Sequence, residues 1–269
     1  EVGAAEIAQL NRWISLDRVI GGSYCPTDGF IKPLAILQGY LAAATRLGVR
    51  LAQGVEVTAL RRDPNGRVIT VETTDGPIHA GAVVNAAGPW AAEVAAMAGV
   101  QLPVMPLRRQ VAATAPCDLL PADMPMTIWA GDGFHLRVRD GRVLLLRPTP
   151  GAAGRPFDTS LEPDWLDAVR VTAHERVPAL RGVAVESAAC WAGLYEMSPD
   201  KHAILGAVPG RDNFYCINGS SGHGVMHAPA LGHLLAEIMC DGRARTLDAT
   251  TLGPARFERG EMIEGSALL

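Results

Sequence analysis

The sequence predicts a mixed α/β (α+β) fold in two parts: an incomplete α/β domain and a second, mostly antiparallel β domain with flanking helices. An apolar run at 78–87 leads through Gly88-Pro89 into a helical pattern, and a glycine-rich loop at 219–224 joins a short strand to a long helical pattern. Such strand–turn–helix units are typical of α/β proteins, which bind ligands at the carboxyl ends of their strands. Between the two units, short alternating runs separated by prolines over 100–190 indicate antiparallel strands.

The first expected elements are a helical piece within 1–23 and a clear helix over 33–48. In the second helix Pro33 suits the first turn, Gly48 suits the end, and apolar residues recur every three or four positions on one face. That face consists of Leu34, Leu37, Leu41 and Ala44.

Two strands are expected next, at 49–60 and 68–73, with the hairpin turn Asn65-Gly66 between them. After a further turn at Asp75-Gly76, the run 78–87 is so apolar that we expect a strand covered on both faces, as in a parallel sheet. Gly88-Pro89 then starts a helix, where proline needs no amide donor.

In the second part we expect strands at 134–138 and 143–147, on either side of the turn Asp140-Gly141. The remaining expected elements are a helix at 163–176, a short strand at 214–218, and a helix at 225–240 closed by Asp241-Gly242.

Composition excludes several function classes. The net charge of −4 and the pI of about 6.0 give no reason to expect nucleic acid or an anionic membrane as a partner. No apolar run approaches the ~20 residues of a transmembrane segment, and residues 1–10 do not resemble a signal peptide. The five cysteines are odd in number and include no C-x-x-C pair, which argues against a metal site or a disulfide framework. We therefore expect buried free thiols and a cytoplasmic protein.

The loop Gly219–Gly224 places three glycines in six positions, directly before a helix. Glycine lets a backbone approach a flat ligand closely, and the free amides and dipole of a helix N-terminus stabilise negative charge. The alternative is that the glycines only allow the strand and the helix to pack tightly.

Several segments together resemble the C-terminal flavin-binding part of the D-amino acid oxidase superfamily. The group most similar comprises sarcosine oxidase β-subunits, dimethylglycine dehydrogenases and bacterial L-proline dehydrogenases, and the resemblance extends from about residue 20 to 260. The segments are Tyr24–Gly29, Asn85–Trp90, Tyr195–Asp200, Ile204–Gly206 and Gly219–Pro229.

The resemblance implies an FAD-dependent oxidoreductase that oxidises a secondary or N-methylated amine or imino acid, such as sarcosine, dimethylglycine or proline. Hydride passes from the carbon beside nitrogen to flavin N5, and the protein supplies positioning and electrostatics. It also implies that 24–98 and 192–245 form a Rossmann-like FAD-binding domain and 99–191 a substrate domain. Residues 1–23 are then an N-terminal piece and 246–269 a C-terminal tail.

The resemblance also assigns cofactor-binding positions to one strand residue, one turn and one loop. They are Val57, Ala86, Ala87 and Gly88, and in the loop Gly219, Ser220, Ser221, Gly222, His223, Gly224, Val225 and Met226. Monomeric sarcosine oxidases attach flavin through a cysteine at the position of Gly193, so we expect non-covalent FAD here, with nearby Cys190 in the core.

Substrate recognition is less defined. Met226 stands where monomeric sarcosine oxidases have a lysine for the substrate carboxylate, so Arg108 or Arg109 is expected to bind it, or the substrate differs. The alternative for both arginines is a solvated strand end. His223 and Tyr195 are candidate catalytic residues, each with a structural alternative: a backbone hydrogen bond for His223 and a core or interface position for Tyr195.

Three further sites are expected to be mainly structural. His227 lies one helical turn after His223, and Asp28-Gly29 forms a turn, although the family keeps flavin or substrate near it. Asp200-Lys201-His202 is expected to be an exposed turn in which Asp200 fixes the loop.

No G-x-G-x-x-G occurs in the sequence, although the family opens with one to hold the cofactor pyrophosphate. Only 23 residues precede Tyr24, so we expect a fragment or one product of a split gene that binds FAD weakly or not at all alone. A sheet edge and apolar surface would then be left uncovered. The alternatives are a partner-dependent or non-catalytic subunit, with a partner chain supplying the nucleotide-binding half, or a member acting on a 2-hydroxy acid or glycerol 3-phosphate.

Overall fold

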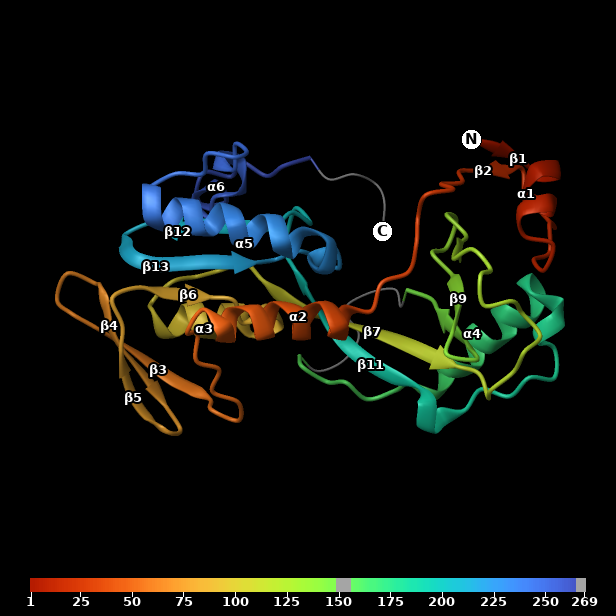
Figure 1. Ribbon diagram of the computed structural model, residues 1–269, viewed down its shortest axis with the longest axis horizontal. Coiled ribbons are helices and arrows are strands. Elements are labelled where there is room, and N and C mark those ends of the chain that lie inside the picture. The colour runs from red at the N-terminus through yellow and green to blue at the C-terminus, as the bar shows by residue number, and fades with distance from the viewer. Residues whose placement is uncertain (149–155, 265–269) are drawn as a thin grey trace. The chain divides into compact units, whose positions relative to one another are not determined.

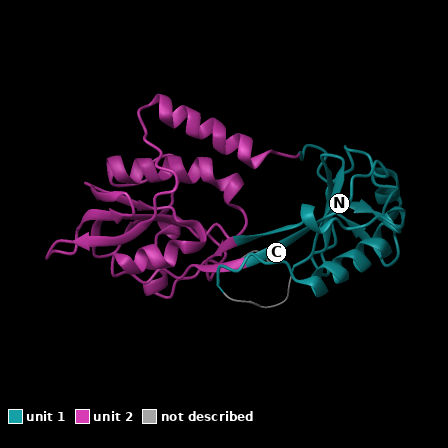
Figure 2. Ribbon diagram, turned by 90° about the horizontal axis from the view of Figure 1, so that it is seen from below, with its two compact units in different colours: residues 1–29, 108–194, 269 teal, residues 30–107, 195–268 magenta. Residues whose placement is uncertain are grey.

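The structure is a computed structural model that describes residues 1–148 and 156–264 (Figure 1). The chain divides into two compact units (Figure 2). The first contains Glu1–Gly29 and Arg108–Leu194, and the second contains Phe30–Leu107 and the described chain from Tyr195 onward. The assignment of a cofactor domain and a substrate domain to the sequence stays a prediction, and residues 265–269 of the predicted tail lie outside the described residues.

The first unit holds the antiparallel sheet that alternation predicts for the middle of the chain. Its strand order is β11-β7-β10-β9-β8, and the pairs β7–β10, β10–β9 and β9–β8 are antiparallel. The strands are β7 (Met105–Ala113), β8 (Thr127–Ile128), β9 (His135–Arg139), β10 (Arg142–Leu146) and β11 (Trp191–Met197), of which β7 begins and β11 ends in the second unit.

Helix α4 (Pro163–Arg176) has the predicted bounds and supplies Trp165, Val169 and Ala173 to the main core cluster of this unit. Phe134 and Leu136 from the sheet complete the centre of that cluster. Two 3₁₀ helices follow, η2 (Pro178–Leu180) and η3 (Ser187–Ala189). The N-terminal piece consists of β1 (Val2–Gly3), α1 (Ala4–Leu10) and β2 (Gly21–Gly22), with β1 and β2 antiparallel.

The second unit contains two three-stranded sheets. One is the antiparallel meander of β3 (Val57–Arg62), β4 (Val68–Thr73) and β5 (Gly76–His79). The other has the order β12-β13-β6, in which β6 (Val83–Asn85) is parallel to β13 (Arg211–Asn218) and β12 (Ile204–Val208) is antiparallel to it.

One long helix packs on the β12-β13-β6 sheet within the second unit. Figure 1 shows α5 (Gly224–Asp241) alongside β12 and β13, where Leu231, Leu234 and Leu235 pack with Leu205. The other helices are α2 (Pro33–Arg46), η1 (Gly88–Trp90), α3 (Ala91–Met97), η4 (Thr250–Leu252) and α6 (Ala255–Glu258). Gly242 ends α5 in the left-handed conformation at φ 77°, as its sequence position predicts.

Two strand predictions are wrong in extent. The strand expected at 49–60 forms only from Val57, and the run 78–87 divides between β5 and β6, which belong to different sheets. Coverage on both faces is also wrong for the described chain, since Val84 is 38% exposed and β6 is an edge strand. Strands β11 and β12 were not predicted, because Gly193 and Gly206 interrupt their patterns.

Helix α2 forms as predicted, but its apolar face is open in the described chain. No described residue of α2 is buried, and Leu34, Leu37 and Tyr40 are 71%, 61% and 57% exposed. Its amphipathic pattern therefore indicates a face whose covering surface is not among the described residues.

All five cysteines are free. The expectation of buried thiols is wrong for Cys25 and Cys240, which are exposed, and holds for Cys216, whose pKa burial raises to about 12. Within the described residues, no helix combines the length and the apolar character that crossing a membrane requires.

Candidate functional site

Two turns lie at the same end of the β12-β13-β6 sheet. Because β6 and β13 are parallel, with Asn85 opposite Cys216, the chain leaves both strands at the same end. The turn Ala86–Gly88 follows β6 and the loop Gly219–Gly224 follows β13. The structure thus brings together two of the predicted cofactor segments, at the place where α/β sheets bind ligands.

Asn85 fixes the first turn. Its buried side chain donates from Nδ2 to the Ala91 carbonyl (2.8 Å) and accepts from the Ala87 amide at Oδ1 (3.1 Å). Gly88 has φ 54°, and no atom lies within 4 Å of the position a Cβ would take there. The turn therefore has a fixed backbone with open space beside its glycine.

The loop Gly219–Gly224 is held against the end of β11. Ser220 pairs with Met197 as an isolated antiparallel bridge, and the Ser221 amide donates to the Glu196 carbonyl (3.1 Å). Three loop residues have left-handed backbones: Gly219 (φ 72°), Ser221 (φ 52°) and Gly222 (φ 93°). For the serine this conformation is uncommon and has to be stabilised by its surroundings.

Packing accounts for two of the loop glycines. A Cβ on Gly222 would lie 2.6 Å from Tyr195 Cε2, and a Cβ on Gly219 would lie 3.0 Å from Ile204 Cγ1. Close protein packing, the alternative to ligand approach, therefore explains these two positions. It places Tyr195, which is 40% exposed, directly against the loop.

Helix α5 begins at the end of this loop, with His223 as its N-terminal boundary residue. The amides of Met226 and His227 donate to the His223 carbonyl (3.1 and 3.3 Å), and the His223 and His227 rings stack with their centroids 5.8 Å apart. The first two amides of the helix, those of Gly224 and Val225, precede these bonds, and the helix dipole is positive at this end. The loop thus presents a site that favours negative charge.

A cavity of about 430 Å³ lies beside this helix start, within the second unit. Its lining includes Lys201, His202, His223, Met226, His227 and Leu252. His223 and Met226 therefore line a cavity, while their role as cofactor-binding residues stays a prediction. Within the described chain, no group of three or more histidine, cysteine, aspartate and glutamate residues is arranged to hold a metal ion.

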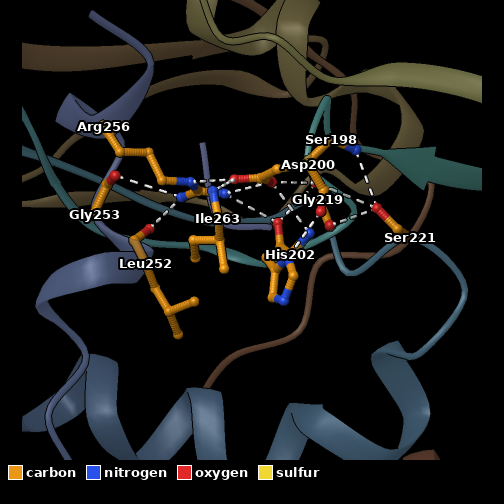
Figure 3. A network of polar contacts seen from close by, with 9 residues as sticks. All are labelled: Ser198, Asp200, His202, Gly219, Ser221, Leu252, Gly253, Arg256 and Ile263. Atoms are coloured by element: carbon orange, nitrogen blue, oxygen red, sulfur yellow. Dashed lines mark hydrogen bonds and ion pairs between the residues drawn. The ribbon is translucent and has the colours of Figure 1, made fainter. Parts of the chain in front are cut away.

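A buried polar network reaches the loop through the contact between Ser198 and Ser221 (Figure 3). Asp200 forms a two-pronged ion pair with Arg256, with Nε–Oδ2 and Nη2–Oδ1 distances of 2.8 and 3.0 Å. The two side chains are only 1% and 2% exposed. The expectation of an exposed turn is therefore wrong for Asp200, although the neighbouring Lys201 is exposed.

Burial by itself raises the pKa of Asp200. The hydrogen bonds from Arg256 and from the amides of His202 and Ile263 outweigh burial and lower the pKa to about 2. The carboxylate is thus charged over the whole physiological range. Sequence reasoning missed Arg256, because nothing near it indicates a partner 56 positions away.

Glu196 behaves differently from Asp200. Its carboxylate accepts from the Ser220 amide at Oε1 (3.3 Å), yet burial raises its pKa despite the amides of Ser220 and Gly219. Its Oε2 is buried without a hydrogen-bond partner in the described residues, and so are both side-chain polar atoms of Asn218, the last residue of β13. Buried polar atoms normally have hydrogen-bond partners, so these atoms next to the loop still require partners.

The other predicted positions are spread more widely. Val57 is half-buried at the start of β3, in the other sheet of the second unit. Gly193 lies in β11, where no atom comes within 4 Å of the position a Cβ would take, and the non-covalent attachment of flavin stays a prediction. Cys190 is half-buried and accepts from the Ala113 amide (3.3 Å), and Asp28 forms a turn with Cys25.

Arg108 and Arg109 belong to the first unit, in β7. Arg108 is 10% exposed and is paired with Asp158 (3.0 Å) and with Glu162. Arg109 is half-buried. A substrate carboxylate could bind Arg108 only by competing with those two carboxylates, so its role in substrate binding stays a prediction.

Substituting Arg108 with alanine is expected to lower the free energy of unfolding by about 2 kcal/mol, because it leaves two half-buried carboxylates without their shared charged donor. Urea denaturation monitored by tryptophan fluorescence measures the loss. Arg170→Ala is the matched control, since its pair with Asp167 is exposed and contributes little. Equal losses in the two variants would contradict a structural role for Arg108.

Comparison with known proteins gives a consistent set of relatives. The family model "FAD dependent oxidoreductase" (DAO) matches residues 2–238. Rat (Rattus norvegicus) mitochondrial dimethylglycine dehydrogenase is 30% identical over 270 residues, which cover 94% of this chain and 31% of that protein. Glycine oxidase from Geobacillus kaustophilus is 28% identical, covering 87% of this chain and 60% of that protein.

Among solved structures, L-proline dehydrogenase from P. horikoshii superposes with a TM-score of 0.87 at 28% identity, covering 97% of this chain and 69% of that one. The chain spans 58% of the mouse (Mus musculus) FAD-dependent oxidoreductase domain-containing protein 1, to which it is 29% identical. The chain thus shares its mixed α/β fold with L-proline dehydrogenase over nearly its whole length.

Proposed function

Because the chain belongs to the DAO family of FAD dependent oxidoreductases, we propose that it forms the flavin-facing part of an enzyme that oxidises a secondary or N-methylated amino acid or an imino acid. The candidate substrates are sarcosine, dimethylglycine and proline. Relatives named for dimethylglycine and L-proline support this substrate class, and a relative named for glycine supports an amino-acid substrate in general.

The observation that carries the proposal is the position of two turns, Ala86–Gly88 and Gly219–Gly224, at the carboxyl ends of a parallel strand pair. Open space beside Gly88 and the unsatisfied polar atoms of Glu196 and Asn218 fit a cofactor that lies along this end of the sheet and carries hydrogen-bonding groups. The sequence contains no G-x-G-x-x-G, the motif that would hold the pyrophosphate of FAD. The residues present therefore fit the flavin end of FAD.

Bound FAD would supply the hydride acceptor and take up negative charge when reduced. The first-turn amides of α5 and its dipole would stabilise that charge. Tyr195 would line the substrate side with its hydroxyl, and His223 would contact the flavin or the substrate from the cavity wall. Met226 offers no charge, so the substrate carboxylate would be bound elsewhere, with Arg108 and Arg109 as the candidates.

Binding of FAD is the first test. We expect the 269-residue chain to bind FAD weakly and non-covalently, because its fit extends to the flavin end only. Titration of FAD into the purified chain, followed by flavin fluorescence, measures this affinity, and acid precipitation shows whether flavin stays in solution. One equivalent of FAD retained through purification, or flavin that precipitates with the protein, would contradict the expectation.

Substrate class is the second test. With FAD bound, the protein should lose its visible flavin absorbance anaerobically when sarcosine, dimethylglycine or proline is added. A 2-hydroxy acid and glycerol 3-phosphate are the comparison substrates. Loss of absorbance with these two alone would replace the proposal by a non-amine oxidoreductase.

A further inference from the structure

The segment after α5 reaches back to the turn that supports the glycine loop (Figure 3). Arg256, in α6, lies beyond the residues 2–238 that the family model matches. Its guanidinium donates to both Asp200 oxygens, to the Leu252 carbonyl (2.7 Å) and to the His202 carbonyl (3.1 Å). The Phe257 ring covers it at 4.1 Å, so a fully buried cation has a full set of acceptors.

Asp200 connects this arginine to the loop through Ser198. The Ser198 hydroxyl lies 3.2 Å from Asp200 Oδ1 and 2.7 Å from the His202 carbonyl, which fixes the Ser198–His202 turn. From the other side of the turn, the Ser198 amide donates to Ser221 Oγ (3.1 Å). The chain of contacts therefore runs from Arg256 through Asp200 and Ser198 to Ser221.

Ser221 is the loop residue whose conformation most needs support. It is a non-glycine residue at φ 52°, and its hydroxyl accepts from Ser198 and donates to the Gly219 carbonyl (2.9 Å). These two bonds join the left-handed serine to the Ser198 turn and to its own loop, and so compensate for the strain. If the turn moves, the strained serine loses the bond from Ser198 that supports its hydroxyl.

We propose that Arg256 is a positioning residue of the candidate site: by neutralising Asp200 it holds the Ser198–His202 turn, and through Ser221 the loop Gly219–Gly224, in the observed conformation. Without Arg256 the Asp200 carboxylate would be buried without its cation, and the turn would open to water to solvate it. The effect on the loop stands by itself, whereas any effect on FAD rests on the proposed function.

A second arginine–carboxylate pair in the chain provides the control for the proposed role of Arg256. Arg176 and Asp132 also form a two-pronged pair, with both distances 2.8 Å, and Arg176 is covered by the Trp129 ring at 5.0 Å. This pair belongs to the first unit, whereas Arg256, Asp200 and the loop belong to the second. The general effect of losing an arginine–carboxylate pair can thus be measured at Arg176 and compared with the effect of losing Arg256.

Hydrogen–deuterium exchange of the chain without cofactor is the test, with the amides of 219–226 as the readout. Arg256→Ala should speed exchange of these amides by about tenfold or more, Arg256→Lys should restore part of the protection, and Arg176→Ala should leave it unchanged. Unchanged loop exchange in Arg256→Ala, or an equal increase in Arg176→Ala, would overturn the proposal.

Ser221→Ala keeps the ion pair and so remains informative if Arg256→Ala does not fold. It should release the loop amides while peptides around Asp200 stay protected, and full protection of the loop in this variant would also overturn the proposal. FAD titration of the same variants separates the two hypotheses. Faster loop exchange with unchanged FAD affinity would keep the positioning role and reject the flavin-facing assignment of the loop.

Discussion

Replacing Gly222 with alanine is expected to destabilise the chain by about 1–3 kcal/mol, through backbone strain and overpacking together. The added Cβ would lie 2.6 Å from Tyr195 Cε2, and the φ of 93° is one that alanine rarely adopts. Either Tyr195 leaves the loop or the loop leaves β11, and in both cases the candidate site changes shape. Urea denaturation gives the change in stability.

Gly232→Ala in the following helix is the matched control. Gly232 lies inside α5 with no atom within 4 Å of its Cβ position, so alanine should stabilise the helix by about 0.5–1 kcal/mol. Opposite signs for two substitutions of the same chemistry are therefore expected. A Gly222→Ala variant as stable as the parent chain would show that Tyr195 does not pack on the loop as described.

Substituting Asp200 with asparagine is expected to cost about 3–5 kcal/mol at pH 7, since it leaves the Arg256 cation buried without its counterion. It should also change the response to acid. The folded-state pKa of about 2 lies below the ordinary value of 3.8, so the carboxylate adds stability that is fully present above about pH 4 and is lost as pH falls through 2. That part amounts to about 2 kcal/mol.

Thermal unfolding between pH 2 and 7 measures both effects. The acid-dependent loss should be smaller in Asp200→Asn than in the parent chain. Asp132→Asn is the comparison, because its side chain is 30% exposed and its loss at pH 7 should be smaller. Equal losses for the two aspartates would contradict the burial on which the network depends.

Local patterns predicted most of the helices and the antiparallel unit. Pro33 and Pro163 mark the first turns of α2 and α4, and Gly242 ends α5, because caps and turns are encoded within a few residues. The run 78–87 shows where this fails. Its apolar composition is continuous, yet β5 and β6 belong to different sheets, and only tertiary pairing separates them.

The candidate site was predictable in part for the same reason. The loop Gly219–Gly224 is visible in the sequence because three glycines fall within six consecutive positions. The Asp200–Arg256 pair is not, since the two residues are 56 positions apart and each looks like a solvated surface charge. Their burial follows only from the path of the chain after α5.

The parallel pairing of β6 with β13 also has a consequence for the order of folding. Val83 pairs with Phe214, 131 positions later (214 − 83), and Arg108–Leu194 of the first unit lies between them. Closing so long an intervening chain costs conformational entropy, which falls if that segment is already compact. The inserted segment should therefore fold before β6 and β13 pair. The end of the sheet that carries the two turns is then among the last parts of the molecule to form.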